Sequence, residues 1–97
     1  MTYTVLTTYE FAAFIAELRD EFARNTIYAR IERVKMGLLG NIRTVKGGVS
    51  EVKVDVGPGY RVYFTVRNRE IIILLCGGDK RTQEQDIRKA QKLAEDY

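Results

Sequence analysis

Hydrophobic residues recur at helical spacing near the start of the chain. Phe11, Phe14 and Ile15 are followed at the same interval by Leu18 and Phe22, which makes one broad apolar face. This spacing predicts an amphipathic helix. We expect its aromatic side chains, including Phe22, to belong to the core.

Short-range signals flank this helix. Tyr3 to Val5 is typical of a short strand, and Thr7 with Glu10 three positions later forms a capping box that predicts the helix start. Residues 24–26 interrupt the helical period. A second apolar stripe then predicts a second helix, ending where Gly37 can adopt a left-handed conformation. The stripe consists of Ile27, Ile31 and Val34.

From Val49 onward the apolar period changes to two. Two alternating segments, joined by the turn sequence Gly57-Pro58-Gly59, predict two half-buried strands. The apolar run from Ile71 to Cys76 predicts a third strand, covered on both faces. In the first two strands the predicted inward residues are Val52, Val54, Val56, Val62, Phe64 and Val66, and the predicted outward residues are Glu51, Lys53, Asp55, Arg61, Tyr63, Thr65 and Arg67.

A last helix is predicted after the turn Gly77-Gly78-Asp79-Lys80. Thr82 and Gln85 form a second capping box at its start. The apolar stripe that follows consists of Ile87, Ala90, Ala94 and Tyr97.

These elements predict an α+β fold in the order β-α-α-β-β-β-α, with a twisted antiparallel sheet packed against helices. A chain of 97 residues has room for one domain, so residues 1–97 are expected to form it. One shared core is expected to contain Phe14, Leu18, Ile31, Val62, Phe64, Ile73, Ile87 and Ala90.

The composition excludes several kinds of site and location. The chain is 45% hydrophobic and 30% charged, the balance of an ordinary soluble protein. It shows no export signal and no bilayer-length apolar segment, so we expect a cytoplasmic location without membrane contact. With no histidine and one cysteine, no metal site, internal disulfide, Ser-His pair or other cofactor is expected. Cys76 ends an apolar strand and is expected to be an inert core residue.

Positive charge is concentrated in the middle of the chain. The net charge is +3, and between residues 30 and 69 the acidic residues are Glu32, Glu51 and Asp55 alone. Such a distribution favours a partner that carries phosphates. The basic residues of this segment are Arg30, Arg33, Lys35, Arg43, Lys46, Lys53, Arg61, Arg67 and Arg69.

The polar sides of the two alternating strands offer one candidate site. A hairpin at residues 57–59 would bring them onto one surface, either a solvated face with ion pairs or a reactive surface. The residues concerned are Glu51, Lys53, Asp55, Arg61 and Tyr63.

Two further features allow two interpretations each. The turn from Gly77 to Lys80 precedes a helix N-terminus, where it could bind an anion or serve only the path of the chain. Tyr63 could stack on a nucleic-acid base or make an ordinary cross-strand contact.

Recognisable motifs cover the stretch from Gly47 to Ala94. They closely resemble those of the phage-derived, HigB-like branch of the RelE/ParE toxin superfamily, and the helical region fits the same branch. The motifs are Gly47-Gly48-Val49-Ser50-Glu51, Gly57-Pro58-Gly59-Tyr60-Arg61-Val62-Tyr63-Phe64 and Leu74-Leu75-Cys76-Gly77-Gly78-Asp79-Lys80, then Gln83, Asp86, Ile87 and Ala90, with Phe14, Leu18, Arg19, Arg30, Ile31 and Gly37 in the helices.

The resemblance implies, for the RNA-cutting members, a ribosome-dependent endoribonuclease that needs no metal. It implies that Arg61 contacts the scissile phosphate, that Lys53 or Glu51 assists proton transfer, and that Lys80 or Arg81 lies near the leaving group. It also implies a cognate DNA-binding antitoxin from a neighbouring gene and a heterotetramer with it. Further RNA contacts are expected from Tyr63, Lys46, Arg43 and Asp79.

The leading hypothesis is therefore a type II toxin that cuts translated messenger RNA through attack of the ribose 2′-hydroxyl. Many RNA-cutting relatives carry a late histidine or tyrosine, whereas here the late tyrosine is Tyr97, which leaves the general acid unassigned. The same fold serves gyrase-poisoning relatives, so the alternatives are a non-catalytic gyrase inhibitor and a plain RNA-binding module. Because Arg61 is expected to lie on an exposed polar face, Arg61→Glu should remove toxicity and leave the fold intact.

Overall fold

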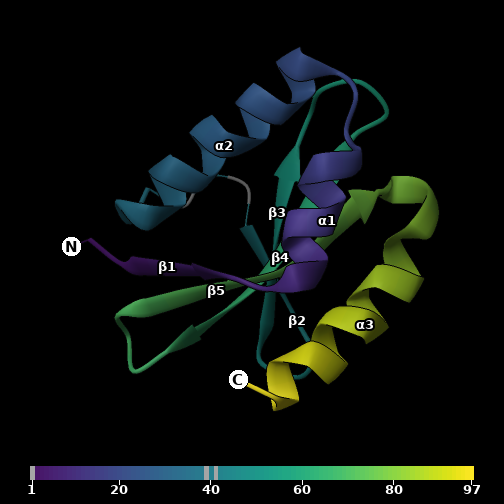
Figure 1. Cartoon of the computed structure of the whole chain (residues 1–97). Coiled ribbons are helices and arrows are strands. Elements are labelled where there is room, and N and C mark those ends of the chain that lie inside the picture. Colours follow the sequence, from purple (N-terminus) through teal and green to yellow (C-terminus); the bar gives the residue numbers. More distant parts are fainter. Residues whose placement is uncertain (1, 39, 41) are drawn as a thin grey trace.

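The chain forms one five-stranded sheet with helices packed beside it (Figure 1). The computed structural model describes residues 2–38, 40 and 42–97. No helix in this part of the chain is both long and apolar enough to cross a membrane. The elements are β1 (Thr4–Thr7), α1 (Tyr9–Glu17), α2 (Glu21–Lys35), β2 (Ile42–Val45), β3 (Val49–Val54), β4 (Tyr60–Arg67), β5 (Ile71–Asp79), the 3-10 turn η1 (Lys80–Thr82) and α3 (Gln83–Glu95).

The sheet has the order β1-β5-β4-β3-β2 and is mixed, not purely antiparallel as predicted. The predicted meander of β3, β4 and β5 is antiparallel, but β1 lies parallel to β5. Sequence analysis also missed β2, which pairs antiparallel with β3. A strand of four residues at the edge of a sheet is too short to show a period.

The two predicted helices are present, but the boundary between them lies at residues 18–20 and not at the predicted residues 24–26. α1 ends at Glu17, and the Asp20 side chain caps α2 by accepting a hydrogen bond from Ala23 N. Phe22 therefore lies at the start of α2, where it is 69% exposed, and the prediction that it belongs to the core is wrong. The cap of α1 is also one residue later than predicted, because Thr8 accepts from Phe11 N.

Helices cover both faces of the sheet, so the predicted single core is two. One cluster joins α1 and α2 to one face and includes Phe11, Ile27 and Phe64. The other joins α3 to the opposite face and includes Tyr63 and Ala90. Of the residues expected in one core, Phe14, Leu18, Ile31, Val62 and Phe64 belong to the first cluster, and Ile73, Ile87 and Ala90 to the second.

The start of α3 is built differently from the predicted capping box. The Thr82 side chain makes no cap hydrogen bond and instead donates to Asp86 Oδ2 over 2.6 Å. Ala90 and Ala94 are buried as predicted, but Tyr97 lies beyond the helix and is half exposed. Thr65 is buried and Val66 is exposed, which is the reverse of the prediction from alternation.

Candidate functional site

The hairpin between β3 and β4 brings the predicted polar residues together. Lys53 lies opposite Arg61, and Glu51 opposite Tyr63. The turn requires positive φ at Gly57 and Gly59, 56° and 85°, which glycine adopts without strain. The sequence predicted that these residues share one face of the hairpin, and the observed register sets which of them lie opposite each other.

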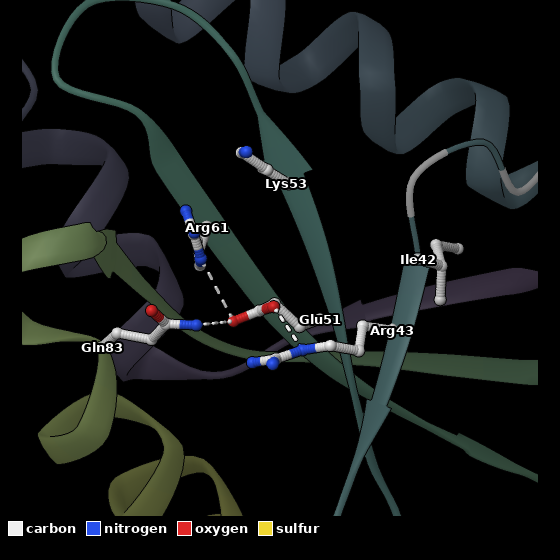
Figure 2. A pocket seen from close by; sticks show the side chains of 6 residues that line it. All are labelled: Ile42, Arg43, Glu51, Lys53, Arg61 and Gln83. Carbon is white, nitrogen blue, oxygen red and sulfur yellow. Dashed lines mark hydrogen bonds and ion pairs between the residues drawn. The ribbon is translucent and has the colours of Figure 1, made fainter.

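A polar cleft of about 540 Å³ opens over this part of the sheet (Figure 2). Its lining residues come from strands β2, β3 and β4 and from the first residue of α3. Its lining is Ile42, Arg43, Glu51, Lys53, Arg61 and Gln83.

Glu51 is the centre of the hydrogen-bond network in this cleft. Its Oε2 accepts from Arg43 Nε over 3.1 Å, and its Oε1 accepts from Gln83 Nε2 over 2.8 Å. Arg61 Nε lies 3.3 Å from Oε1 in an ion pair. Figure 2 shows the carboxylate between the side chains of Arg43 and Gln83. Glu51 is buried, and these partners offset the cost of burying its charge.

Arg61 keeps unused hydrogen-bonding capacity inside the cleft. Its side chain is 13% exposed, and Nε and Nη1 have no hydrogen-bond partner among the described residues. Buried donors without acceptors are costly, and a guanidinium binds phosphate in a planar, two-point geometry. The arrangement can therefore accept an oxyanion beside Glu51.

Lys53 and Lys80 extend the positive charge away from Glu51. Lys53 is half exposed, and its Nζ lies 3.5 Å from Asp55 Oδ1. Lys53, Arg61 and Lys80 line a second hollow of about 280 Å³ next to the Gly57-Pro58-Gly59 turn. Lys80 N donates to Gly59 O over 3.2 Å, which holds the residue beside the hairpin. Lys53, Arg61, Tyr63 and Lys80 were expected to converge on one concave basic surface, and three of the four share this hollow.

Tyr63 is the exception, because it is fully buried under α3. Burial, followed by the negative charges of Glu51 and Asp86, raises the pKa of its hydroxyl well above the ordinary value. A ring without exposed surface cannot stack on a base, so the predicted RNA contact of Tyr63 is wrong. The cross-strand interpretation applies, with Glu51 as the opposite residue.

Arg81 and Asp79 pair with each other at the turn. Arg81 Nη2 lies 2.8 Å from Asp79 Oδ2, and the hydrogen bonds from Arg81 hold the pKa of Asp79 below its usual range. Arg81 lines a hollow with Gln85 and Arg88, not the cleft. Asp79 Oδ1 also accepts from Arg81 N and so caps η1.

The remaining RNA-contact candidates lie around β2. Arg43 is shared by the cleft and a neighbouring hollow that also contains Lys46. Lys46 O accepts from Gln91 Nε2 over 2.9 Å, so its backbone is tied to α3.

Gly77 and Gly78 were predicted to lie in a turn, but they belong to the end of β5, where they have a packing role. A Cβ on Gly77 would clash with the Phe14 ring, and a Cβ on Gly78 with Asp86 Oδ2. Cys76 before them is buried, as predicted, and burial raises the pKa of its thiol to about 12.

Sequence analysis assigned no role to Gln83. An uncharged residue at the start of a helix changes neither the apolar period nor the charge balance. A signal was nonetheless present, because Gln83 is the first residue after a turn that follows a central strand.

This fold is similar to that of a solved protein structure. The structure of a mutant of the E. coli toxin RelE in the free state matches it with a TM-score of 0.76 at 14% identity, covering 95% of this chain and 98% of that chain. The fold is therefore RelE-like. The family of phage-derived Gp49-like proteins (DUF891) matches residues 10–95, and the chain belongs to this family. The expectations of a RelE-like fold and of a phage-derived family are confirmed.

One relative extends the match to the whole chain. An uncharacterized protein of Haemophilus influenzae (strain KW20 / Rd) is 43% identical over 96 residues. The match covers 99% of this chain and 97% of the relative. The similarity therefore extends over almost the full length of both chains.

Proposed function

We propose that this protein is the toxin of a type II toxin–antitoxin pair and cuts translated messenger RNA at the ribosome without a metal ion. The observation that carries the proposal is the cleft, where Arg61 Nε is ion-paired with the buried carboxylate of Glu51 and Arg61 Nη1 is a buried donor without a hydrogen-bond partner among the described residues. A phosphodiester supplies the anion, and the adjacent ribose supplies the hydroxyl.

In the proposed reaction the 2′-oxygen forms a bond to phosphorus and the bond from phosphorus to the 5′-oxygen breaks. The products are a 2′,3′-cyclic phosphate and a 5′-hydroxyl. Arg61 binds the phosphate and stabilises the charge that develops on its oxygens. The ribosome contributes by holding the message in the geometry of attack.

Glu51 is the better proton acceptor of the two candidates. Hydrogen bonds from Arg43 and Gln83 use two of the roughly four lone-pair sites of its carboxylate, so an acceptor position remains for the 2′-hydroxyl. Lys53 is paired with Asp55 and serves as a cation for phosphate. For the leaving oxygen we assign Lys80, because it shares a hollow with Arg61, whereas Arg81 is bound to Asp79.

The partners under this proposal are the ribosome, messenger RNA and a cognate DNA-binding antitoxin, in the cytoplasm. The antitoxin, in a heterotetramer with the toxin, would silence it by covering the cleft or by blocking entry into the ribosome. Arg43 and Lys46 would contact flanking phosphates from the β2 side.

The test compares Arg61→Gln with Arg69→Gln, which removes the same charge from an exposed turn. After induction in cells, the 5′ ends of messages are mapped and DNA breaks are measured. Wild type and Arg69→Gln should cut messages inside codons, and Arg61→Gln should lose about 100-fold or more. DNA breaks with intact messages would support gyrase inhibition instead, and cutting by Arg61→Gln at the wild-type rate would contradict the site.

The charge reversal Arg61→Glu is a poor variant for this test. It was expected to be harmless to the fold on an exposed face, but Arg61 is largely buried beside Glu51. A second carboxylate there would face the first at close range, so loss of activity could follow from misfolding.

A further inference from the structure

Gln83 is the one residue of α3 that lines the cleft, within the part of the chain that the structure describes. It is the first residue of the helix, and its Nε2 donates to Glu51 Oε1 over 2.8 Å. The two residues are 32 positions apart in the sequence, so only the folded chain brings them together. Figure 2 shows the amide pointing toward the carboxylate.

We propose that Gln83 is a positioning residue for RNA cleavage and acts through Glu51. The inference rests on the proposed function and adds to it a role for an uncharged side chain. The amide N–H holds Oε1 in one place through this hydrogen bond. Its effect reaches the RNA only through Glu51 and Arg61.

The hydrogen bond from Gln83 also affects the contact between Glu51 Oε1 and Arg61 Nε. Oε1 lies 2.8 Å from Gln83 Nε2 and 3.3 Å from Arg61 Nε, and only the first contact is a hydrogen bond. Without the amide, Oε1 would turn to the next donor, which is Arg61 Nε. The guanidinium would then be occupied by Glu51 instead of phosphate, and the carboxylate would be drawn away from the 2′-hydroxyl.

Hydrogen bonds in the turn before α3 and at its start fix the position of Gln83. Asp79 Oδ1 accepts from Arg81 N over 2.8 Å, and Thr82 Oγ1 donates to Asp86 Oδ2 over 2.6 Å. The bond from Lys80 N to Gly59 O ties the same turn to the hairpin. Gln83 follows these contacts directly, so its side chain starts from a fixed point next to the cleft.

The charged and titratable groups around Glu51 come from several elements. Arg43 belongs to β2, and Arg61 and Tyr63 belong to β4. Lys53 shares the strand of Glu51 and the lining of the cleft, and Asp86 of α3 acts on Tyr63. A substitution at Gln83 alters none of these groups, so a changed pH dependence in such a variant reports on the amide.

Single-turnover cleavage of a message on programmed ribosomes, with the full chain, tests this role. Gln83→Ala should lower the cleavage rate about 10- to 100-fold and leave the half-saturating ribosome concentration within about twofold of wild type. Gln83→Glu places a second carboxylate at hydrogen-bond distance, where two carboxylates share a proton. The acid limb of its pH–rate profile should therefore move up by about one pH unit or more.

Gln85 provides the matched controls, because it is the same residue type on the first turn of the same helix and is exposed. Gln85→Ala and Gln85→Glu should cleave like wild type. Melting temperatures within about 5 °C of wild type would tie a lost rate to the site. If Gln83→Ala melts much lower, the pH profile of Gln83→Glu, whose side chain has the same shape, decides.

The outcomes separate the two proposals. If wild type cuts and Gln83→Ala cuts at the same rate, or if Gln83→Glu keeps the wild-type pH profile, Gln83 does not position the carboxylate and the inference is wrong. If wild type itself cuts no message on the ribosome, the proposed function fails and the role of Gln83 fails with it.

Discussion

Replacing Tyr63 by alanine should unfold or nearly unfold the protein. Tyr63 is the largest fully buried side chain, in the cluster between α3 and the sheet. Truncating a buried aromatic ring to alanine costs about 3–5 kcal/mol. In a domain of this size each kcal/mol lowers the melting temperature by about 4–8 °C, so the expected fall is about 12–40 °C. Thermal unfolding followed by circular dichroism measures it.

Two variants serve as controls for this result. Tyr63→Phe keeps the ring and should melt within about 5 °C of wild type. Tyr9→Ala removes a tyrosine that is 82% exposed and should change the free energy of unfolding by about 0.5 kcal/mol or less. If Tyr63→Ala melted near wild type, the ring would not lie in the core. If it also bound ribosomes poorly, the rejected role in RNA stacking would have to be restored.

Two further predictions concern buried polar atoms. Cys76 has a folded pKa of about 12 against an unfolded value near 9.0, so above about pH 9 the unfolded state binds fewer protons and stability falls as pH rises toward 12. Urea unfolding between pH 8 and 11 should show a shallower fall for Cys76→Ala, and parallel curves would contradict this. Thr8 accepts from Phe11 N and donates to Leu75 O over 2.6 Å, so Thr8→Val should cost about 1–3 kcal/mol in urea unfolding. Thr7→Val at the neighbouring exposed position should cost little, and an equal loss there would restore the cap predicted from sequence.

Sequence analysis predicted well where the signal is local. Alternation over several residues predicted β3 and β4, and the glycine-rich turn between them predicted the hairpin. It thereby placed Lys53 and Arg61 on one face, and the structure shows that they lie opposite each other. It failed where the signal was too short or continued across a boundary. β2 has four residues, and Phe22 continues the apolar spacing of α1 although Asp20 has already started a new helix.

The sequence by itself determined the α+β class, the β3–β4 hairpin and the row of basic and acidic side chains along it, because all three depend on neighbours in the chain. Only the tertiary structure decided which side chains of that row are buried and which line a cleft. α3 packs over one part of the polar face, burying Tyr63, and brings Gln83 onto Glu51, while the rest stays open as a cleft around Arg61. Alternation tells which side chains share a face, but burial of that face depends on an element tens of residues away.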